Sequence, residues 1–143
     1  MEKTLSPKTL DSQILPGIID RIKAIFTDYV ILILLLLIIS NVFSSIEYVP
    51  DSIRIASFIL LFGLYDPLST AFLGGTFGHL AMGLRVRQKD DPSKKINLPK
   101  AILRFFIKFL LGAISLFTVT GNKNKMAIHD MAIDSIVLFK EKK

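Results

Sequence analysis

Two aspartates in or beside apolar segments are the first residues of this 143-residue chain that could carry chemistry. Asp28 stands at the start of one apolar run, and Asp66 stands inside another, directly before Pro67. Ionisable side chains in membrane-embedded segments are costly to place there and commonly have a function. Because burial disfavours the charged form of a carboxylate, either aspartate could bind a cation or exchange protons.

Each aspartate also has a structural interpretation. Arg21 precedes Asp28 by seven residues, so both side chains lie on one helical face and could form an ion pair that orients the helix end. Arg104 and Lys108 are four residues apart in a third apolar segment and also share a face, from which either could pair with Asp66. The sequence leaves both interpretations open for both aspartates.

The adjacent residues His129 and Asp130 follow the third apolar segment. They could form a hydrogen-bonded dyad, a proton relay or half of a metal site. Two residues are too few to hold a metal on their own. The structural interpretation is that they link the C-terminal tail to the helix ends.

A glycine-rich turn, Gly74-Gly75-Thr76-Phe77-Gly78, follows the second apolar segment. Successive backbone amides in such a turn can cradle an anion. The simpler interpretation is that the glycines let the chain turn between a helix and the next connector.

Two long apolar segments must position these residues. No charged side chain occurs over the eighteen positions from Tyr29 to Ile46, which is long enough for a transmembrane helix. We expect one helix over 16–43 and a second from Ile55 to about Gly78. Residues 1–15 are expected to form a flexible tail, and residues 16–143 a single membrane domain.

The third apolar segment, 101–119, has two possible topologies. It could cross the membrane and place the C-terminal tail outside, or it could be re-entrant or interfacial and leave the tail in the cytoplasm. The second topology would let a strand over 84–87 pair with a strand over 136–139, because both segments alternate or cluster apolar residues. The expected fold is therefore an all-α membrane protein with two transmembrane helices, this third membrane-embedded segment and a short cytoplasmic strand pair.

The charges indicate the orientation and exclude several classes of protein. The chain has 18 Lys and Arg residues against 12 Asp and Glu residues. Six of these basic residues lie in the connector 80–100, which predicts that this connector and the N-terminus are cytoplasmic. The absence of cysteine excludes disulfides and thiolate metal sites. We expect no enzymatic activity, cofactor, bound metal or nucleic-acid partner.

The motifs taken together resemble the RDD family of bacterial membrane proteins, named for one arginine and two aspartates. The matching segments are Arg21-Ile-Lys-Ala24-Ile-Phe-Thr-Asp28, the glycine turn followed by Gly83-Leu84-Arg85-Val86, and His129-Asp130. The resemblance implies that Arg21, Asp28 and Asp130 are the family's three characteristic residues. It also implies a location in the bacterial inner membrane. His79 stands where the family has a lysine, and Ala132-Ile133-Asp134 replaces the family's Ala-Gly-Thr.

Two functions are compatible with this sequence. The first is ion or small-solute transport by a homo-oligomer, with Asp28 and Asp66 lining a path between subunits. The alternative is an accessory or scaffold subunit whose charges are structural and whose apolar faces pack against a larger membrane complex. In both cases the lipid bilayer is a partner.

Overall fold

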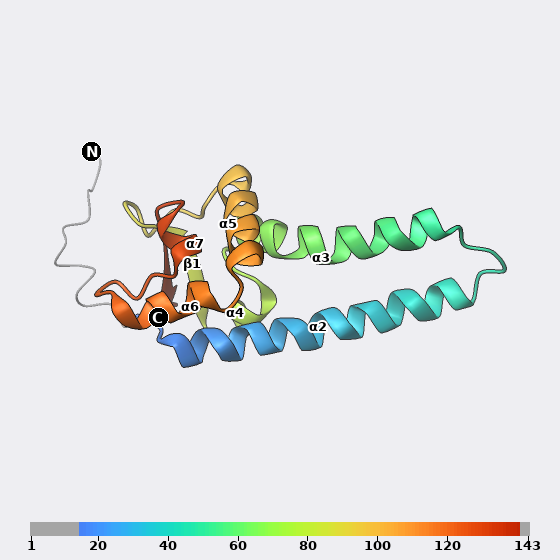
Figure 1. Ribbon diagram of the computed structural model, residues 1–143, viewed down its shortest axis with the longest axis horizontal. Coiled ribbons are helices and arrows are strands. Elements are labelled where there is room, and N and C mark those ends of the chain that lie inside the picture. Colours follow the sequence, from blue (N-terminus) through green and yellow to red (C-terminus); the bar gives the residue numbers. More distant parts are fainter. Residues whose placement is uncertain (1–14, 141–143) are drawn as a thin grey trace.

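The computed structural model describes residues 15–140, so most of the predicted N-terminal tail lies outside the described residues. Two long helices extend side by side from a small head (Figure 1). These helices are α2 (Ile18–Ser44) and α3 (Asp51–Leu73). The head contains α4 (Phe77–Ala81), β1 (Leu84–Gln88), α5 (Leu98–Leu111), α6 (Ile114–Gly121), α7 (Ile128–Met131) and β2 (Ser135–Phe139).

Both long helices have the length and composition of membrane spans, which confirms the predicted pair of transmembrane helices. Their large apolar side chains are exposed along most of their length; Leu37 on α2 and Ile59 on α3 are examples. Such continuous apolar exposure is suited to lipid rather than to water.

The second span differs from its expected limits at both ends. It begins at Asp51, directly after Pro50, because an acidic side chain in the first turn interacts favourably with the helix dipole. It ends at Leu73 because Gly74 adopts a left-handed conformation with φ of 82°. The glycine turn therefore stops this helix before Gly78, and a separate short helix, α4, follows.

The two strands pair antiparallel, with Leu84 opposite Phe139 and Val86 opposite Val137. This is the strand pair that the sequence predicts. The side chains of Leu84, Val86 and Val137 are buried in the main apolar core. Ala24 of α2 and Ala101 of α5 belong to the same core, which therefore joins the sheet to the first span and to the third segment.

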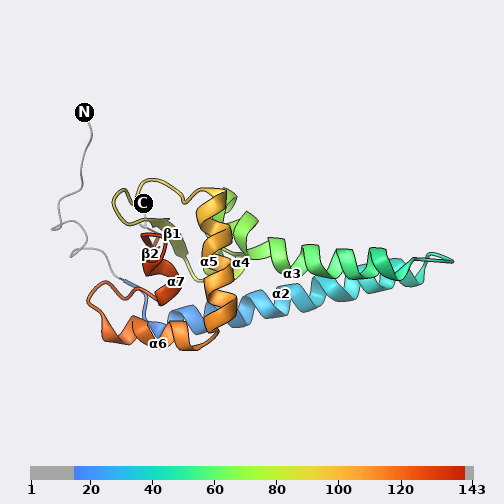
Figure 2. The same ribbon diagram turned by 45° about the horizontal axis from the view of Figure 1, so that its top comes forward.

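The third apolar segment is bent rather than straight. Helices α5 and α6 meet at 102° across a break at Gly112, which has φ of 51°. Figure 2 shows α5 running across the direction of the two long helices. The hydrogen-bonded strands β1 and β2 flank this segment in the chain, so the two stretches that lead into and out of it meet in one sheet. This pairing favours the re-entrant or interfacial topology over a single full crossing.

Candidate functional site

One face of α2 docks onto the head and carries the characteristic motif of the first helix. Arg21, Ala24 and Asp28 follow one another at spacings of three and four residues, so they share this face. All three are buried, and Ala24 has no exposed surface. The neighbouring Ile22 and Phe26 point away from the head and are exposed.

Arg21 pairs with Asp130 and not with Asp28. Its Nη1 lies 2.5 Å from Asp130 Oδ2, and its Nη2 donates a 2.8 Å hydrogen bond to the Lys125 carbonyl. The expected ion pair between Arg21 and Asp28 is therefore not formed. Both side chains do share a face, but the head places a separate partner opposite each of them.

Arg104 joins two carboxylates from different helices. Its Nε donates to Asp130 Oδ1 at 3.0 Å, and its Nη1 lies 3.5 Å from Asp66 Oδ1. The other Asp66 oxygen accepts a 2.5 Å hydrogen bond from Lys108 Nζ. The structure thus brings Asp66 together with both Arg104 and Lys108, as its structural interpretation expects.

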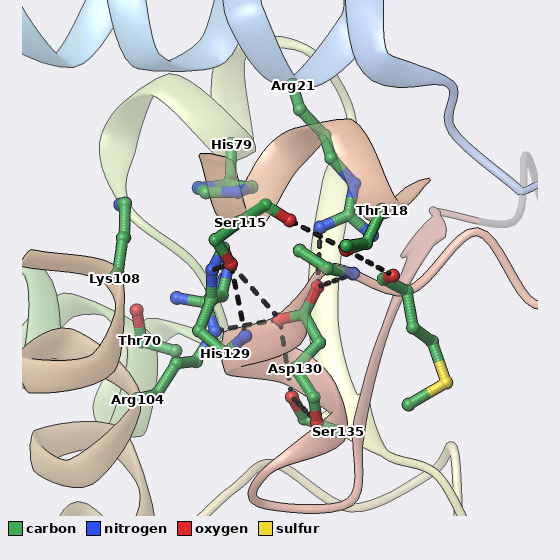
Figure 3. Close-up of polar contacts among 12 residues, drawn as sticks. Arg21, Thr70, His79, Arg104, Lys108, Ser115, Thr118, His129, Asp130 and Ser135 are labelled. Atoms are coloured by element: carbon green, nitrogen blue, oxygen red, sulfur yellow. Dashed lines mark hydrogen bonds and ion pairs between the residues drawn. The ribbon is translucent and has the colours of Figure 1, made fainter. Parts of the chain in front are cut away.

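The result is one continuous charge network, defined here as Arg21, Asp130, Arg104, Asp66 and Lys108 in that order. It links α2, α7, α5 and α3, and Figure 3 shows several of these side chains converging in the head. Four of the five side chains are almost completely buried, whereas Lys108 retains 23% of its exposure.

The cations of this network keep Asp130 ionised. Burial alone would raise the pKa of the Asp130 carboxyl, but Arg21 and Arg104 outweigh it and hold that pKa well below its ordinary value. Two further groups, the Ala127 amide and the Ser135 hydroxyl, donate to the same carboxylate. Asp130 is therefore a permanently charged, fully bonded acceptor at the centre of the head.

Asp28 has a separate set of donors. It accepts hydrogen bonds from Tyr65 Oη at 2.7 Å, Thr76 Oγ1 at 2.6 Å and the backbone amide of Gly78 at 2.7 Å. The glycine turn does bind an anion through a backbone amide, and that anion is the chain's own Asp28 carboxylate. A Cβ atom at position 78 would lie 2.7 Å from Asp28 Cγ and would also collide with the Ala24 carbonyl, so this contact requires glycine.

The two histidines are buried and uncharged near neutral pH. Burial, followed by Arg104 and Lys108, lowers the pKa of His79 well below its ordinary value. Burial likewise lowers the pKa of His129 to about 3, against the opposing effect of Asp130.

His129 and Asp130 do not form the hydrogen-bonded dyad considered from the sequence. His129 Nε2 and Asp130 Oδ1 are 3.7 Å apart, beyond hydrogen-bond distance. The ring nitrogen Nδ1 instead lies 2.6 Å from Ser115 Oγ. Within residues 15–140, no group of three His, Cys, Asp or Glu side chains is placed to hold a metal ion.

Two contributors to the site did not stand out in the sequence: Tyr65 binds Asp28, and Ser115 binds His129. His79, which stands where the family has a lysine, lies 2.6 Å from the Thr76 hydroxyl through its Nδ1. Tyr65 and Ser115 are polar groups inside otherwise apolar segments. Such isolated hydroxyls were a usable signal, because a hydroxyl buried among apolar residues needs a hydrogen-bond partner.

Comparison with known proteins supports the resemblance seen in the motifs. The sequence model of the RDD family matches residues 15–134, which include the whole charge network and Asp28. No curated protein and no solved structure matches the chain.

Proposed function

The chain belongs to the RDD family, and on that premise we propose that this small membrane protein is a non-enzymatic accessory subunit of a larger membrane assembly. One observation carries the proposal: all three buried aspartates within residues 15–140 are bound inside the chain. Asp28 accepts from three donors, Asp66 faces two cations and Asp130 faces two arginines. Carboxylates bound in this way hold the spans to the head and leave little capacity for an external cation.

The surface that would meet a partner is an open groove between the two spans. It has a volume of about 410 Å³ and is lined by Ile39, Ser57, Leu60, Leu61, Leu64, Tyr65 and Leu68. In lipid, helices associate through close packing and interhelical hydrogen bonds. This groove offers both to a partner transmembrane helix: its lining is mostly apolar, and Ser57, whose proton is donated to the Ile53 carbonyl, presents its hydroxyl oxygen as an acceptor.

The test is purification from native membranes in mild detergent, with the chain at its natural expression level. We expect a partner protein to co-purify with the wild-type chain in fixed stoichiometry. Leu61→Trp, which fills the groove, should abolish this co-purification. The matched control is Leu37→Trp, because Leu37 is 60% exposed and does not line the groove. The proposal fails if the chain is recovered alone, or if both tryptophan variants retain the same partner.

Transport by a homo-oligomer is the second candidate, and one observation favours it. Asp66 faces two cations, Arg104 and Lys108, so its carboxylate could exchange partners during a transport cycle. This candidate predicts that Asp66→Asn or Asp28→Asn abolishes proton or sodium flux in proteoliposomes while the protein stays folded. Unchanged flux in both variants would exclude it.

We further propose that the chain lies in the bacterial inner membrane with its head and the start of α2 in the cytoplasm. The support is the concentration of Lys and Arg in the 80–100 connector, which belongs to the head.

A further inference from the structure

A small cavity lies within the head, beside the charge network. Its volume is about 10 Å³. Two apolar side chains and five polar ones line it, and the polar ones are Arg21, His79, Arg104, Lys108 and His129. The polar side chains come from α2, α4, α5 and α7 (Figure 3). Three of them are cationic, and neither Asp66 nor Asp130 lines the cavity. Those carboxylates contact the cations without facing the space itself.

Two buried guanidinium nitrogens of this lining lack a hydrogen-bond partner within residues 15–140. They are Arg21 Nε and Arg104 Nη1, and their side chains are only 2% and 1% exposed. Arg104 Nη1 lies 3.5 Å from Asp66 Oδ1 without forming a hydrogen bond. Buried donors are rarely left unsatisfied, so these two groups call for an acceptor.

The cations, and not the carboxylates, border the cavity. Arg21, Arg104 and Lys108 contribute three positive charges to its lining. Asp66 and Asp130 pair with these cations without lining the space, and the charge of Asp28 also acts on Arg104. The charges of the whole region are therefore balanced, but the space itself is bordered by positive groups.

We propose that this cavity binds a single monatomic anion, a halide such as chloride. A space of this size admits one water-sized particle, so phosphate, sulfate and carboxylates are too large. The anion would accept hydrogen bonds from the unpartnered guanidinium nitrogens and would lie among the three cations of the lining. This site does not depend on either proposed function.

His79 is the neutral side chain of the lining that hydrogen-bonds to Thr76. The single Thr76 hydroxyl proton is donated to Asp28, so His79 Nδ1 acts as a donor to Thr76 and its Nε2 carries a lone pair. The charged groups around His79 are Arg21 and Asp28 of α2, Asp66 of α3, and Arg104 and Lys108 of α5. Burial and these cations hold the pKa of His79 well below 6.5, so the ring is neutral both at pH 6 and at pH 8. Halide binding should therefore change little between these two pH values.

The experiment measures the thermal unfolding midpoint of the full chain in detergent at constant ionic strength, as chloride or bromide replaces gluconate. We expect a saturable rise for both halides and none for sulfate. Lys108→Met removes one lining cation and should weaken the halide response about tenfold. The matched control is Lys94→Met, because Lys94 has 68% exposure and lies outside the cavity.

A second measurement does not depend on a folded variant. Equilibrium dialysis of the wild-type chain against radioactive chloride should give one bound ion per chain, with similar binding at about pH 6 and at pH 8. The proposal is overturned if no chloride is retained, since the cavity then holds water. It is equally overturned if sulfate and chloride act alike, or if Lys108→Met and Lys94→Met respond like the wild type.

Discussion

The guanidinium of Arg21 and the carboxylate of Asp130 form a buried ion pair of 2.5 Å between residues that are 109 positions apart. The pair joins the first turn of α2 to the short helix α7, and so it closes the domain from one end to the other. Its two side chains are only 2% and 0% exposed. Removing one member of such a pair leaves an uncompensated buried charge, which costs more free energy than the intact pair supplies.

The first prediction concerns Asp130. Replacing it with asparagine, Asp130→Asn, removes the charge that faces both Arg21 and Arg104, and should lower the free energy of unfolding by about 3–5 kcal/mol. Chemical unfolding in detergent micelles, followed by circular dichroism, measures the change. Asp91→Asn is the matched control, because Asp91 pairs with the exposed Lys94 and an exposed pair contributes little. Equal stability of the two variants would contradict the role assigned to Asp130.

The second prediction concerns the contact between α2 and α4. Gly78→Ala places a methyl group against the Asp28 carboxylate and the Ala24 carbonyl, so it should destabilise the fold by about 2 kcal/mol or more. Gly63→Ala is the control, because no atom lies within 4 Å of a Cβ at that helical position. Alanine is favoured over glycine in helices, so the control should be neutral or stabilising. A harmless Gly78→Ala would show that α4 is not held against Asp28.

The elements of this fold could be predicted from local patterns, but the pairings of Arg21 and Asp28 could not. Uninterrupted apolar runs reveal the spans, and alternating residues reveal the strand over Leu84–Gln88. The spacing of Arg104 and Lys108 places both on the face that reaches Asp66. Helical spacing also relates Arg21 to Asp28, and there it misleads. The packing of the head determines the partners, because it places Asp130 opposite Arg21 and the glycine turn opposite Asp28.

The third prediction concerns the Tyr65 hydroxyl. Tyr65→Phe removes a 2.7 Å hydrogen bond to Asp28, and should lower the free energy of unfolding by about 1–3 kcal/mol, because the carboxylate loses a buried donor. Tyr48→Phe removes the same atom from a side chain that is 79% exposed, and should have no measurable effect. If both variants unfold like the wild type, Tyr65 does not contribute to holding α2 and α3 together.

The fourth prediction is the pH dependence of stability. His129 has a pKa of about 3 in the folded chain, against an ordinary value of 6.5. Between these values the unfolded chain binds a proton that the folded chain does not, so acidification from pH 6.5 destabilises the fold. The expected loss is about 1.4 kcal/mol per pH unit from this histidine, and His79 acts in the same direction.

His129→Gln tests this assignment, because it should remove the His129 part of the slope and leave the part from His79. Asp130 contributes no slope in this window, since its pKa is held below the ordinary value of 3.8. Unfolding midpoints measured between about pH 5 and pH 8 give the slope for each protein. A wild-type chain with a flat profile would show that neither histidine is buried in its neutral form.

The fifth prediction concerns topology, and the cysteine-free sequence makes it simple to test. Single cysteines are introduced as Ser45→Cys in the loop between the spans, Ser93→Cys in the connector, and Lys123→Cys after α6. An impermeant maleimide should label Ser93→Cys and Lys123→Cys from one face of the membrane and Ser45→Cys from the other. The reason is that the pairing of β1 with β2 keeps both ends of the third segment on one side. Labelling of Lys123→Cys from the same face as Ser45→Cys would mean that α5 and α6 form a full crossing, and would contradict the sheet.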